Sequence, residues 1–284
     1  MTDHTVHSRR SALRGLLHST HLGPSVAVTI VAIGLGVGLQ LPLWRLVILG
    51  LAILLNQFSV GLSNDWLDAE RDREVGRTDK PVALGLVTAE AVRNAAFVAA
   101  LASVLLTIPL GWLATVANAV FIVSAWAYNA AFKNMPLSVL PYIVSFGLLP
   151  LIATLARPQP ALAAPWAVAL GALLGVAAHF ANVLPDLADD ERTGIAGLPH
   201  RIGRRASGGV IVVSLGLASI LAFFGPSGRA TAMQWIGLVL TLALALAIGV
   251  TLTRPPTRLL FQLIIAAALV NVVVLALSGD RLLA

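Results

Sequence analysis

The chain has 284 residues, of which 58% are hydrophobic and 11% are charged, and its mean hydropathy is +0.88. A soluble domain carries about 25% charged residues, so this composition excludes an ordinary soluble globule and favours an integral membrane protein. The net charge of +6 then indicates cytoplasmic loops beside anionic lipid headgroups, and we expect no nucleic-acid partner. The absence of cysteine excludes disulfides and thiolate metal sites.

The N-terminal residues 1–23 lack an apolar stretch and a small-residue cleavage site, so we predict a polar or interfacial cytoplasmic segment. Nine apolar windows follow, each close to the ~20 residues that a membrane-crossing helix needs. They lie at about 24–43, 46–63, 92–109, 111–130, 138–156, 163–184, 208–226, 232–252 and 258–278. The sequence therefore predicts an all-α domain of nine transmembrane helices over residues 24–278, followed by a short tail at 279–284.

The basic residues predict the orientation of this domain. With the N-terminus in the cytoplasm, only Arg45, Arg157, Arg229 and Arg281 of the 19 lysines and arginines fall on the far side. Cytoplasmic loops of membrane proteins carry an excess of such residues. We therefore expect a cytoplasmic N-terminus and a C-terminus on the far side. The composition, rich in Ala, Arg and Leu with only two Lys residues, is typical of a high-GC bacterium, so a bacterial plasma membrane is expected.

Two long cytoplasmic loops, at about 64–91 and 185–207, hold most of the thirteen acidic residues. They begin with "NDWLDAERD" and "NVLPDLADD", which both read N-x-x-x-D-x-x-x-D. The two triplets are Asn64, Asp68, Asp72 and Asn182, Asp186, Asp190. Because one follows the second window and the other the sixth, the pattern predicts two four-helix units related as a pseudo-repeat, plus one further helix.

Residues spaced by four share one face of a helix, so each triplet offers an amide and two carboxylates on one stripe. Carboxylate oxygens are ligands for Mg²⁺, which typically lies between carboxylates and substrate phosphates. The triplets therefore predict a site for Mg²⁺ and a diphosphate. The alternative, solvated loop acids, does not account for the duplication. Five further acids lie off the stripes, as supporting or solvated groups: Asp65, Glu70, Glu74, Asp189 and Glu191.

Three cations lie close to the first triplet, either in sequence or at the same level of a helix end. Arg77 and Lys80 follow it directly, and Lys133 ends the fourth predicted helix. Arginine binds phosphate with two parallel hydrogen bonds and lysine binds it as a point charge, so we expect these side chains to contact the diphosphate. The general excess of positive charge on the cytoplasmic side is the alternative explanation.

These motifs resemble the UbiA superfamily of intramembrane prenyltransferases. "NDWLDAERD" followed by "GRTDKP" is similar to the first Asp-rich motif of that family, and "NVLPDLADDERTG" is similar to the second. "YNAAFK" at residues 128–133 resembles the family's Tyr/Lys segment, and nine helices with long loops after the second and sixth match its architecture.

The resemblance implies a helical bundle around a central cavity that opens to the cytoplasm and to lipid. It implies a Mg²⁺-dependent enzyme whose two triplets hold Mg²⁺ ions that bind an isoprenyl diphosphate, with Asp68, Asp72, Asp186 and Asp190 as the catalytic carboxylates. The diphosphate leaves, and the allylic carbocation is attacked by a small-molecule acceptor. This acceptor is expected to be an aromatic acid, a quinone precursor or a glycerol phosphate, with the aromatic or quinone precursor favoured.

The acceptor region is the least determined part of the sequence. Tyr128 could flank the cation with its ring or could anchor the helix at the membrane interface. Asn129 is a neighbouring pocket candidate. His179, three residues before Asn182, could act as a base, contact the diphosphate, or bond only within the bundle. His200 is expected in the second loop.

Two other functions remain open at this point. A membrane terpene cyclase on the same scaffold would begin with the same ionisation and use no acceptor. A lipid transporter or lipid-binding protein would place its acids on broken helices near the bilayer midplane instead of at helix ends. Neither the isoprenoid length nor the acceptor follows from the sequence.

Overall fold

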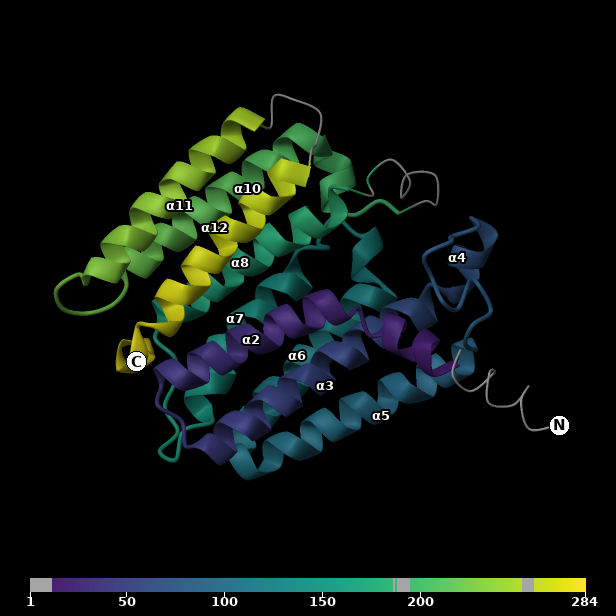
Figure 1. The fold of residues 1–284 in the computed structure, drawn as a ribbon, viewed down its shortest axis with the longest axis horizontal. Helices are drawn as coiled ribbons and strands as arrows, with labels where there is room; N and C mark the ends of the chain where they lie inside the picture. The colour runs from purple at the N-terminus through teal and green to yellow at the C-terminus, as the bar shows by residue number, and fades with distance from the viewer. Residues whose placement is uncertain (1–11, 186, 188–194, 252–257) are drawn as a thin grey trace.

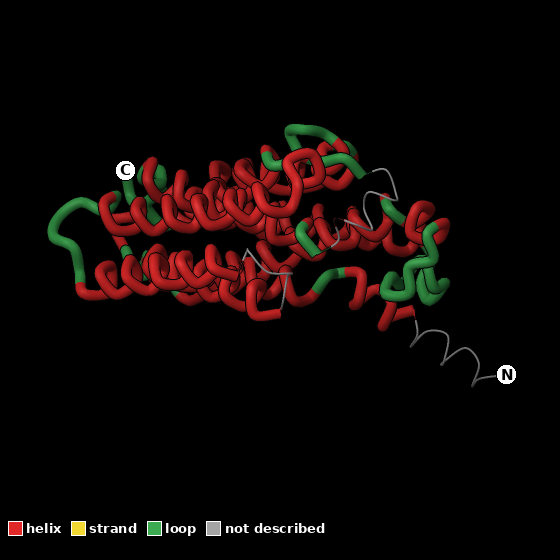
Figure 2. Tube along the Cα trace, turned by 90° about the horizontal axis from the view of Figure 1, so that it is seen from above, coloured by secondary structure: helices red, strands yellow, loops and turns green. Residues whose placement is uncertain are grey.

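The computed structural model describes residues 12–185, 187, 195–251 and 258–284. Regular structure in these ranges is helical apart from one isolated antiparallel bridge between Ala163 and Leu283. Figure 2 shows the helices running side by side, with the connecting loops gathered at the two ends of the bundle. The predicted ligands Asp186 and Asp190 lie outside the described residues.

A short helix, Ala12–Ser19, precedes the bundle. The long helices are α2 (Leu22–Gly38), α3 (Leu43–Leu67), α5 (Ala89–Thr107), α6 (Trp112–Ala130), α7 (Leu140–Leu155), α8 (Pro165–Val183), α10 (Leu198–Phe224), α11 (Ala232–Thr251) and α12 (Arg258–Ala276). The short elements are α4 (Ala69–Glu74) and the 3₁₀ turns η1 (Ile108–Leu110), η2 (Phe132–Asn134) and η3 (Gly279–Leu282). Each predicted apolar window overlaps one of the long helices.

Six helices in the described ranges are long and apolar enough to cross a membrane: α3, α5 with η1, α6, α8, α10 and α11. The count is up to seven if Ala12–Ser19 and α2, which meet at a bend of 52°, form one broken span. The apolar helix α7 and the segment Gln262–Ala276 of α12 are shorter. Many large apolar side chains on these helices are exposed, as a lipid environment requires.

The long helices close into a ring of neighbours. Each packs against the next in chain order, and α12 packs against α2, which completes the circuit. Figure 1 shows Ala12–Ser19 and α4 at one end of the bundle and the C-terminal turn η3 at the other. The loop that carries the first Asp-rich motif therefore lies at the end opposite the C-terminus.

Buried polar side chains join α3, α5 and α6 inside the bundle. Asn56 Nδ2 donates to Asn118 Oδ1 over 2.8 Å, and Asn118 Nδ2 donates to Ser103 Oγ over 2.9 Å. Ser103 Oγ in turn donates to the carbonyl oxygen of Ala52 over 2.7 Å. In lipid each of these groups needs a partner within the protein, so the chain of bonds fixes the register of the three helices.

The second long loop is shorter than the sequence predicts on its C-terminal side. Residues 198–207 were expected in the loop, but α10 already begins at Leu198, with Pro199 in its first turn. Proline is favoured there because its missing N–H has no partner in a first turn. The helical course is interrupted at Gly203, whose φ of 76° is left-handed, before the apolar part of α10 follows.

Candidate functional site

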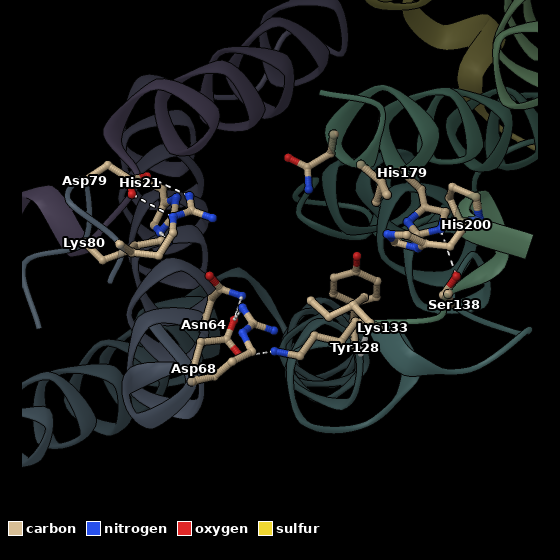
Figure 3. A pocket seen from close by; sticks show the side chains of 17 residues that line it. His21, Asn64, Asp68, Asp79, Lys80, Tyr128, Lys133, Ser138, His179 and His200 are labelled. Atoms are coloured by element: carbon tan, nitrogen blue, oxygen red, sulfur yellow. Dashed lines mark hydrogen bonds and ion pairs between the residues drawn. The ribbon is translucent and has the colours of Figure 1, made fainter. Parts of the chain in front are cut away.

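A polar cavity of about 310 Å³ opens at the end of the bundle where α4 lies. Its walls come from the ends of α3, α6, α8 and α10, from η2 and from the loop after α4. Figure 3 shows Asn64 and Asp68 on one side, Tyr128 and Lys133 beside them, and His179 and His200 opposite. Four cations line it: Arg71, Arg77, Lys80 and Lys133.

The first triplet spans a helix junction instead of a single helix. Asn64 lies in the last turn of α3, Asp68 links α3 to α4, and Asp72 lies in α4. The i to i+4 backbone bonds continue through the junction, from Asp68 N to Asn64 O over 3.0 Å and from Asp72 N to Asp68 O over 2.8 Å. The three side chains therefore stay close to one stripe, as the spacing predicts.

Asp68 is the centre of the contacts at this end of the cavity. Its Oδ1 forms an ion pair with Lys133, and its Oδ2 accepts from Asn64 Nδ2 over 3.1 Å. Arg71 lies 3.1 Å from the same Oδ2 and 3.4 Å from Asp72 Oδ1. Because its three side-chain partners, Asn64, Arg71 and Lys133, come from α3, α4 and η2, Asp68 ties these elements together.

Two ionisable groups beside Asp68 have shifted pKa values. Burial raises the pKa of Asp72, and the neighbouring Asp68 carboxylate adds to the rise, against the opposing effect of Arg71. Burial lowers the pKa of the Lys133 ammonium group, while its contact with Asp68 acts in the other direction. The Asp72 carboxylate is therefore crowded, and an added cation would favour its charged form.

The remaining cations of the cavity are also paired with acids. Arg77 forms a two-pronged contact with Asp79, with both distances 2.8 Å, and this holds the pKa of Asp79 at about 2. Lys80 Nζ donates to Asp65 Oδ1 over 2.7 Å. Asp65, which the sequence leaves as a supporting or solvated group, is thus the buried partner of Lys80.

His21 also reaches Asp65, and it lies beside Lys80 on the same side of the cavity (Figure 3). Its Nε2 lies 2.9 Å from Asp65 Oδ1 and 3.4 Å from Lys80 Nζ. His21 lies at the bend before α2 in a left-handed conformation, with a φ of 51°. Gly61 on α3 permits this bend, because a Cβ there would lie 2.7 Å from the carbonyl oxygen of Thr20. The expected polar N-terminal segment therefore supplies a side chain to the cavity wall.

His179 and Ser138 meet on the opposite wall. His179 is buried on α8, and its Nε2 lies 3.0 Å from Ser138 Oγ, which also accepts from the backbone N–H of Leu198 over 2.9 Å. Gly197 allows this approach, because a Cβ there would lie 2.6 Å from the carbonyl oxygen of Lys133. Among the described residues, no hydrogen-bond partner reaches His179 Nδ1.

The expectation that His200 lies in the loop is wrong. It lies in the first turn of α10 and lines the polar cavity, because the helix begins two residues earlier than this side chain. The "GLP" sequence at 197–199 was the available signal, since proline favours the first turn of a helix.

The pocket candidates of α6 take different positions. Tyr128 lines the cavity, with its ring edge-on to Tyr142 at 5.0 Å and to His179 at 5.6 Å between centroids. Asn129 is buried, and its Nδ2 donates to Ser63 Oγ over 2.8 Å and to Val60 O over 2.9 Å. Asn129 therefore ties α6 to α3, while Tyr128 presents an aromatic surface.

A second, apolar cavity of about 270 Å³ lies between α2, α3, α6, α7 and α8. It shares four lining residues with the polar cavity: His21, Asn64, Tyr128 and Asn182. Phe121, Tyr142 and Phe146 contribute to its wall. The two cavities therefore adjoin at these four residues, called the shared ring below.

The first triplet has the donor chemistry of a hard-cation site. Amide and carboxylate oxygens suit Mg²⁺, and the raised pKa of Asp72 reflects negative charge that burial disfavours. In the part of the chain that the structure describes, no three His, Asp or Glu side chains are grouped to hold one ion. Asn182 lines both cavities, and the other two residues of its triplet are outside the described ranges.

Four polar lining residues were not singled out from the sequence: His21, Arg71, Asp79 and Ser138. His21 lies more than forty residues from its partner Asp65, and Ser138 lies 41 residues from His179. Spacing rules relate residues within one element, so they give no signal for such pairs. Arg71 could have been found, because it lies one residue before Asp72 in the motif itself.

The long apolar helices are those of an integral membrane protein, and they surround a charged cavity that adjoins an apolar one. Residues 25–259 match the UbiA prenyltransferase family. The chain belongs to this family.

Two relatives are similar to the chain in sequence, and a solved structure is similar to it in fold. The chain is 32% identical over 169 residues to a 4-hydroxybenzoate octaprenyltransferase of Nitrosomonas europaea and 31% identical over 187 residues to one of Nitrosomonas eutropha. The matches cover 57% and 63% of this chain and 56% and 64% of the relatives. A UbiA homolog from Archaeoglobus fulgidus, solved with GPP and Mg²⁺, has a TM-score of 0.72 at 13% identity, covering 93% of this chain and 99% of that one.

Proposed function

We propose that this protein is a Mg²⁺-dependent prenyltransferase, which transfers the prenyl group of an isoprenyl diphosphate to an acceptor within the membrane. The observation that carries the proposal is the junction of the two cavities. Four cations line the polar cavity, where a diphosphate would bind, and the shared ring opens from it into the apolar cavity, where a prenyl chain would bind. An isoprenyl diphosphate has these two parts in this order.

Both triplets would hold the metal: Asn64, Asp68 and Asp72 with Asn182, Asp186 and Asp190. When bound, Mg²⁺ supplies positive charge that neutralises the diphosphate and the crowded carboxylates. Lys133 and Arg71 already lie at Asp68, so either could turn from this carboxylate to a phosphate oxygen. Arg77 and Lys80 would contact the diphosphate from the loop side.

The reaction breaks the bond between the allylic C1 carbon and the diphosphate oxygen, and the pyrophosphate keeps the electron pair. The cations of the polar cavity stabilise the negative charge on the leaving group. The apolar cavity excludes water from the allylic cation. The aromatic side chain of Tyr128, at the junction of the two cavities, offers its π electrons to this cation. An acceptor carbon then donates an electron pair to C1 and loses a proton.

Transfer is favoured over the alternatives. The relatives from Nitrosomonas are named for transfer to 4-hydroxybenzoate, so we propose an aromatic acceptor and do not retain the cyclase. Family membership likewise disfavours the lipid transporter.

We also propose that all nine long helices cross the bilayer, as two four-helix units and one further helix, over residues 24–278. The charge distribution of the loops supports a cytoplasmic N-terminus and cytoplasmic polar cavity, with the tail at 279–284 on the far side of a bacterial plasma membrane.

The test is pyrophosphate release by purified protein with geranyl, farnesyl or geranylgeranyl diphosphate, in Mg²⁺ and then in EDTA, with and without a phenol. We expect release that needs both Mg²⁺ and the phenol, with a product heavier by one prenyl group. The variant Asp186→Ala is expected to lose this release. Release without a phenol, giving a hydrocarbon or terpene alcohol, would establish a cyclase.

A further inference from the structure

The short helix Ala12–Ser19 turns one face to the protein and another face away from it. Residues that are four apart share one face of a helix. Gly15 and Ser19, which are four apart, are buried. Leu13 and Leu17, also four apart, are 60% and 45% exposed. The helix therefore carries an exposed apolar stripe on the side away from its packed face.

A polar pair borders this apolar stripe. Arg14 and His18 follow Leu13 and Leu17 by one position, and both are exposed. Successive residues of a helix are about 100° apart, so the guanidinium group of Arg14 lies beside the stripe and not opposite it. An apolar face bordered by a basic side chain is typical of a helix that lies in the surface of a membrane.

The depth of this helix follows from the bend that joins it to α2. Large apolar side chains are exposed on α2 as well, at Leu22, Val26 and Ile30, and such a surface faces lipid when α2 crosses the bilayer as proposed. The helix Ala12–Ser19 has eight residues, about 12 Å of length, and meets α2 at a bend of 52°. Measured along α2 it advances only about 7 Å, close to the ~5–8 Å of one headgroup layer. Its place is therefore among the lipid headgroups.

The packed face of the helix lies against the loop that helps to form the polar cavity. A Cβ at Gly15 would lie 3.0 Å from the Cβ of Val87, in the loop after α4. Leu16 packs against a buried apolar cluster that includes Val82 and Val87. Lys80, which lines the polar cavity, belongs to the same loop. A displacement of the helix would therefore be felt by the loop.

A second link runs through the bend itself. The backbone N–H of His21 donates to the carbonyl oxygen of His18 over 3.1 Å, so His21 follows the end of the helix. Its Nε2 lies 2.9 Å from Asp65 Oδ1, the same oxygen to which Lys80 Nζ donates over 2.7 Å. The helix and the Lys80 ammonium group thus meet at one buried carboxylate.

We propose that the helix Ala12–Ser19 binds the headgroups of an anionic bilayer and that this contact holds Lys80 at the polar cavity. Leu13 and Leu17 would lie at the boundary with the acyl chains, and Arg14 would bind a lipid phosphate, because basic side chains beside a membrane surface are attracted to anionic lipids. The part that concerns Lys80 rests on the proposed function. Binding of lipid and binding of diphosphate then strengthen each other by the same factor.

Fluorescence quenching tests the lipid contact without any enzyme activity. The chain has no cysteine, so a single introduced thiol gives one labelling position. The full chain is placed in nanodiscs of equal parts phosphatidylcholine and phosphatidylglycerol, with the label on Leu17→Cys or, as the matched control on the polar side, on His18→Cys. We expect brominated acyl chains to quench the first label at least about twofold more than the second, and iodide in water to show the reverse. Equal quenching of both labels, or no quenching of the first by brominated lipid, overturns the proposal.

Equilibrium dialysis of geranyl diphosphate tests the link to the site. In the anionic nanodiscs, Arg14→Gln should raise the dissociation constant about fivefold, the effect of one basic side chain at an anionic surface, whereas in phosphatidylcholine alone it should change little. Arg93→Gln removes the same charge from α5, where the side chain is 43% exposed, and is the matched control. Equal effects of the two variants, or no effect of Arg14→Gln, overturn the link.

The two measurements keep the lipid contact apart from the proposed function. If geranyl diphosphate binds in neither kind of nanodisc, the prenyltransferase proposal fails and the role of Lys80 fails with it. The quenching result then decides the membrane contact of the helix alone.

Discussion

Replacing Asp65 with alanine removes the carboxylate that both His21 and Lys80 contact. Asp65 is only 2% exposed, and the Lys80 side chain is 14% exposed, so the pair is largely shielded from water. With 2.7 Å between Nζ and Oδ1, the gross attraction is about 6 kcal/mol at an effective dielectric constant of 20. Much of this is offset, because Lys80 regains water at the cavity mouth once its partner is lost.

We therefore expect Asp65→Ala to destabilise the folded protein by about 3 kcal/mol. At about 2–4 °C for each kcal/mol, the midpoint of thermal inactivation should fall by about 6–12 °C. The assay heats the detergent-solubilised protein in steps and follows the loss of the monodisperse peak in size-exclusion chromatography.

A double-mutant cycle with Lys80→Met shows whether the cost belongs to the ion pair. The double variant removes both charges, so its loss should be smaller than the sum of the two single losses by about 2 kcal/mol. Additive losses, or an Asp65→Ala protein within about 1 °C of the unsubstituted chain, would refute the argument that this pair stabilises the site.

Three further outcomes are expected. Asp68→Ala should lower Mg²⁺-dependent pyrophosphate release by about 10²–10³-fold, because a group that stabilises the leaving diphosphate is lost. Glu90 is an exposed carboxylate on α5 outside both cavities, so the control variant Glu90→Gln should retain this release. Full activity of Asp68→Ala would exclude Asp68 from the site. Lys133→Met should raise the dissociation constant of geranyl diphosphate, measured by equilibrium dialysis, by about 10-fold or more, because one charged hydrogen bond to the diphosphate is lost. A change below twofold would contradict the role of Lys133 as a diphosphate contact. Gly171→Ala would place a Cβ 2.5 Å from the carbonyl oxygen of Phe146, so it should destabilise the protein at the α7–α8 contact by about 1–3 kcal/mol, measured by thermal inactivation. Gly216→Ala is the control, because a Cβ there meets open space and should not destabilise the protein. Equal stability of the two variants would contradict this account.

The helices follow from the sequence because hydropathy acts over a whole window. Each of the nine windows is apolar along its length, and each overlaps a helix. Hydropathy predicted the positions of the helix ends less well than it predicted the helices themselves. The first helical turn of α10 lies ten residues before its apolar window begins, because residues 198–207 are too polar to be recognised by hydropathy alone.

Some residues of the candidate site were also predicted from the sequence, and others were not. Asn64, Asp68 and Lys133 were predicted from spacing and from their level at helix ends, and the structure brings them together. The roles of Asp65 and His21 could not be predicted, because their contact depends on the bend before α2 and on the close approach at Gly61. Such contacts are set by the packing of distant segments, which a periodic pattern does not encode.

The shared ring has a consequence for the order in which substrates bind. His21, Asn64, Tyr128 and Asn182 belong to both cavities, so a diphosphate bound in the polar cavity as proposed would cover the passage from that cavity to the apolar one. An acceptor must then arrive before the diphosphate or come from the lipid between helices. If the acceptor arrives first, the order of binding is compulsory, and excess isoprenyl diphosphate inhibits transfer. If the acceptor comes from the lipid, the rate of transfer follows the concentration of acceptor in the bilayer instead of that in water.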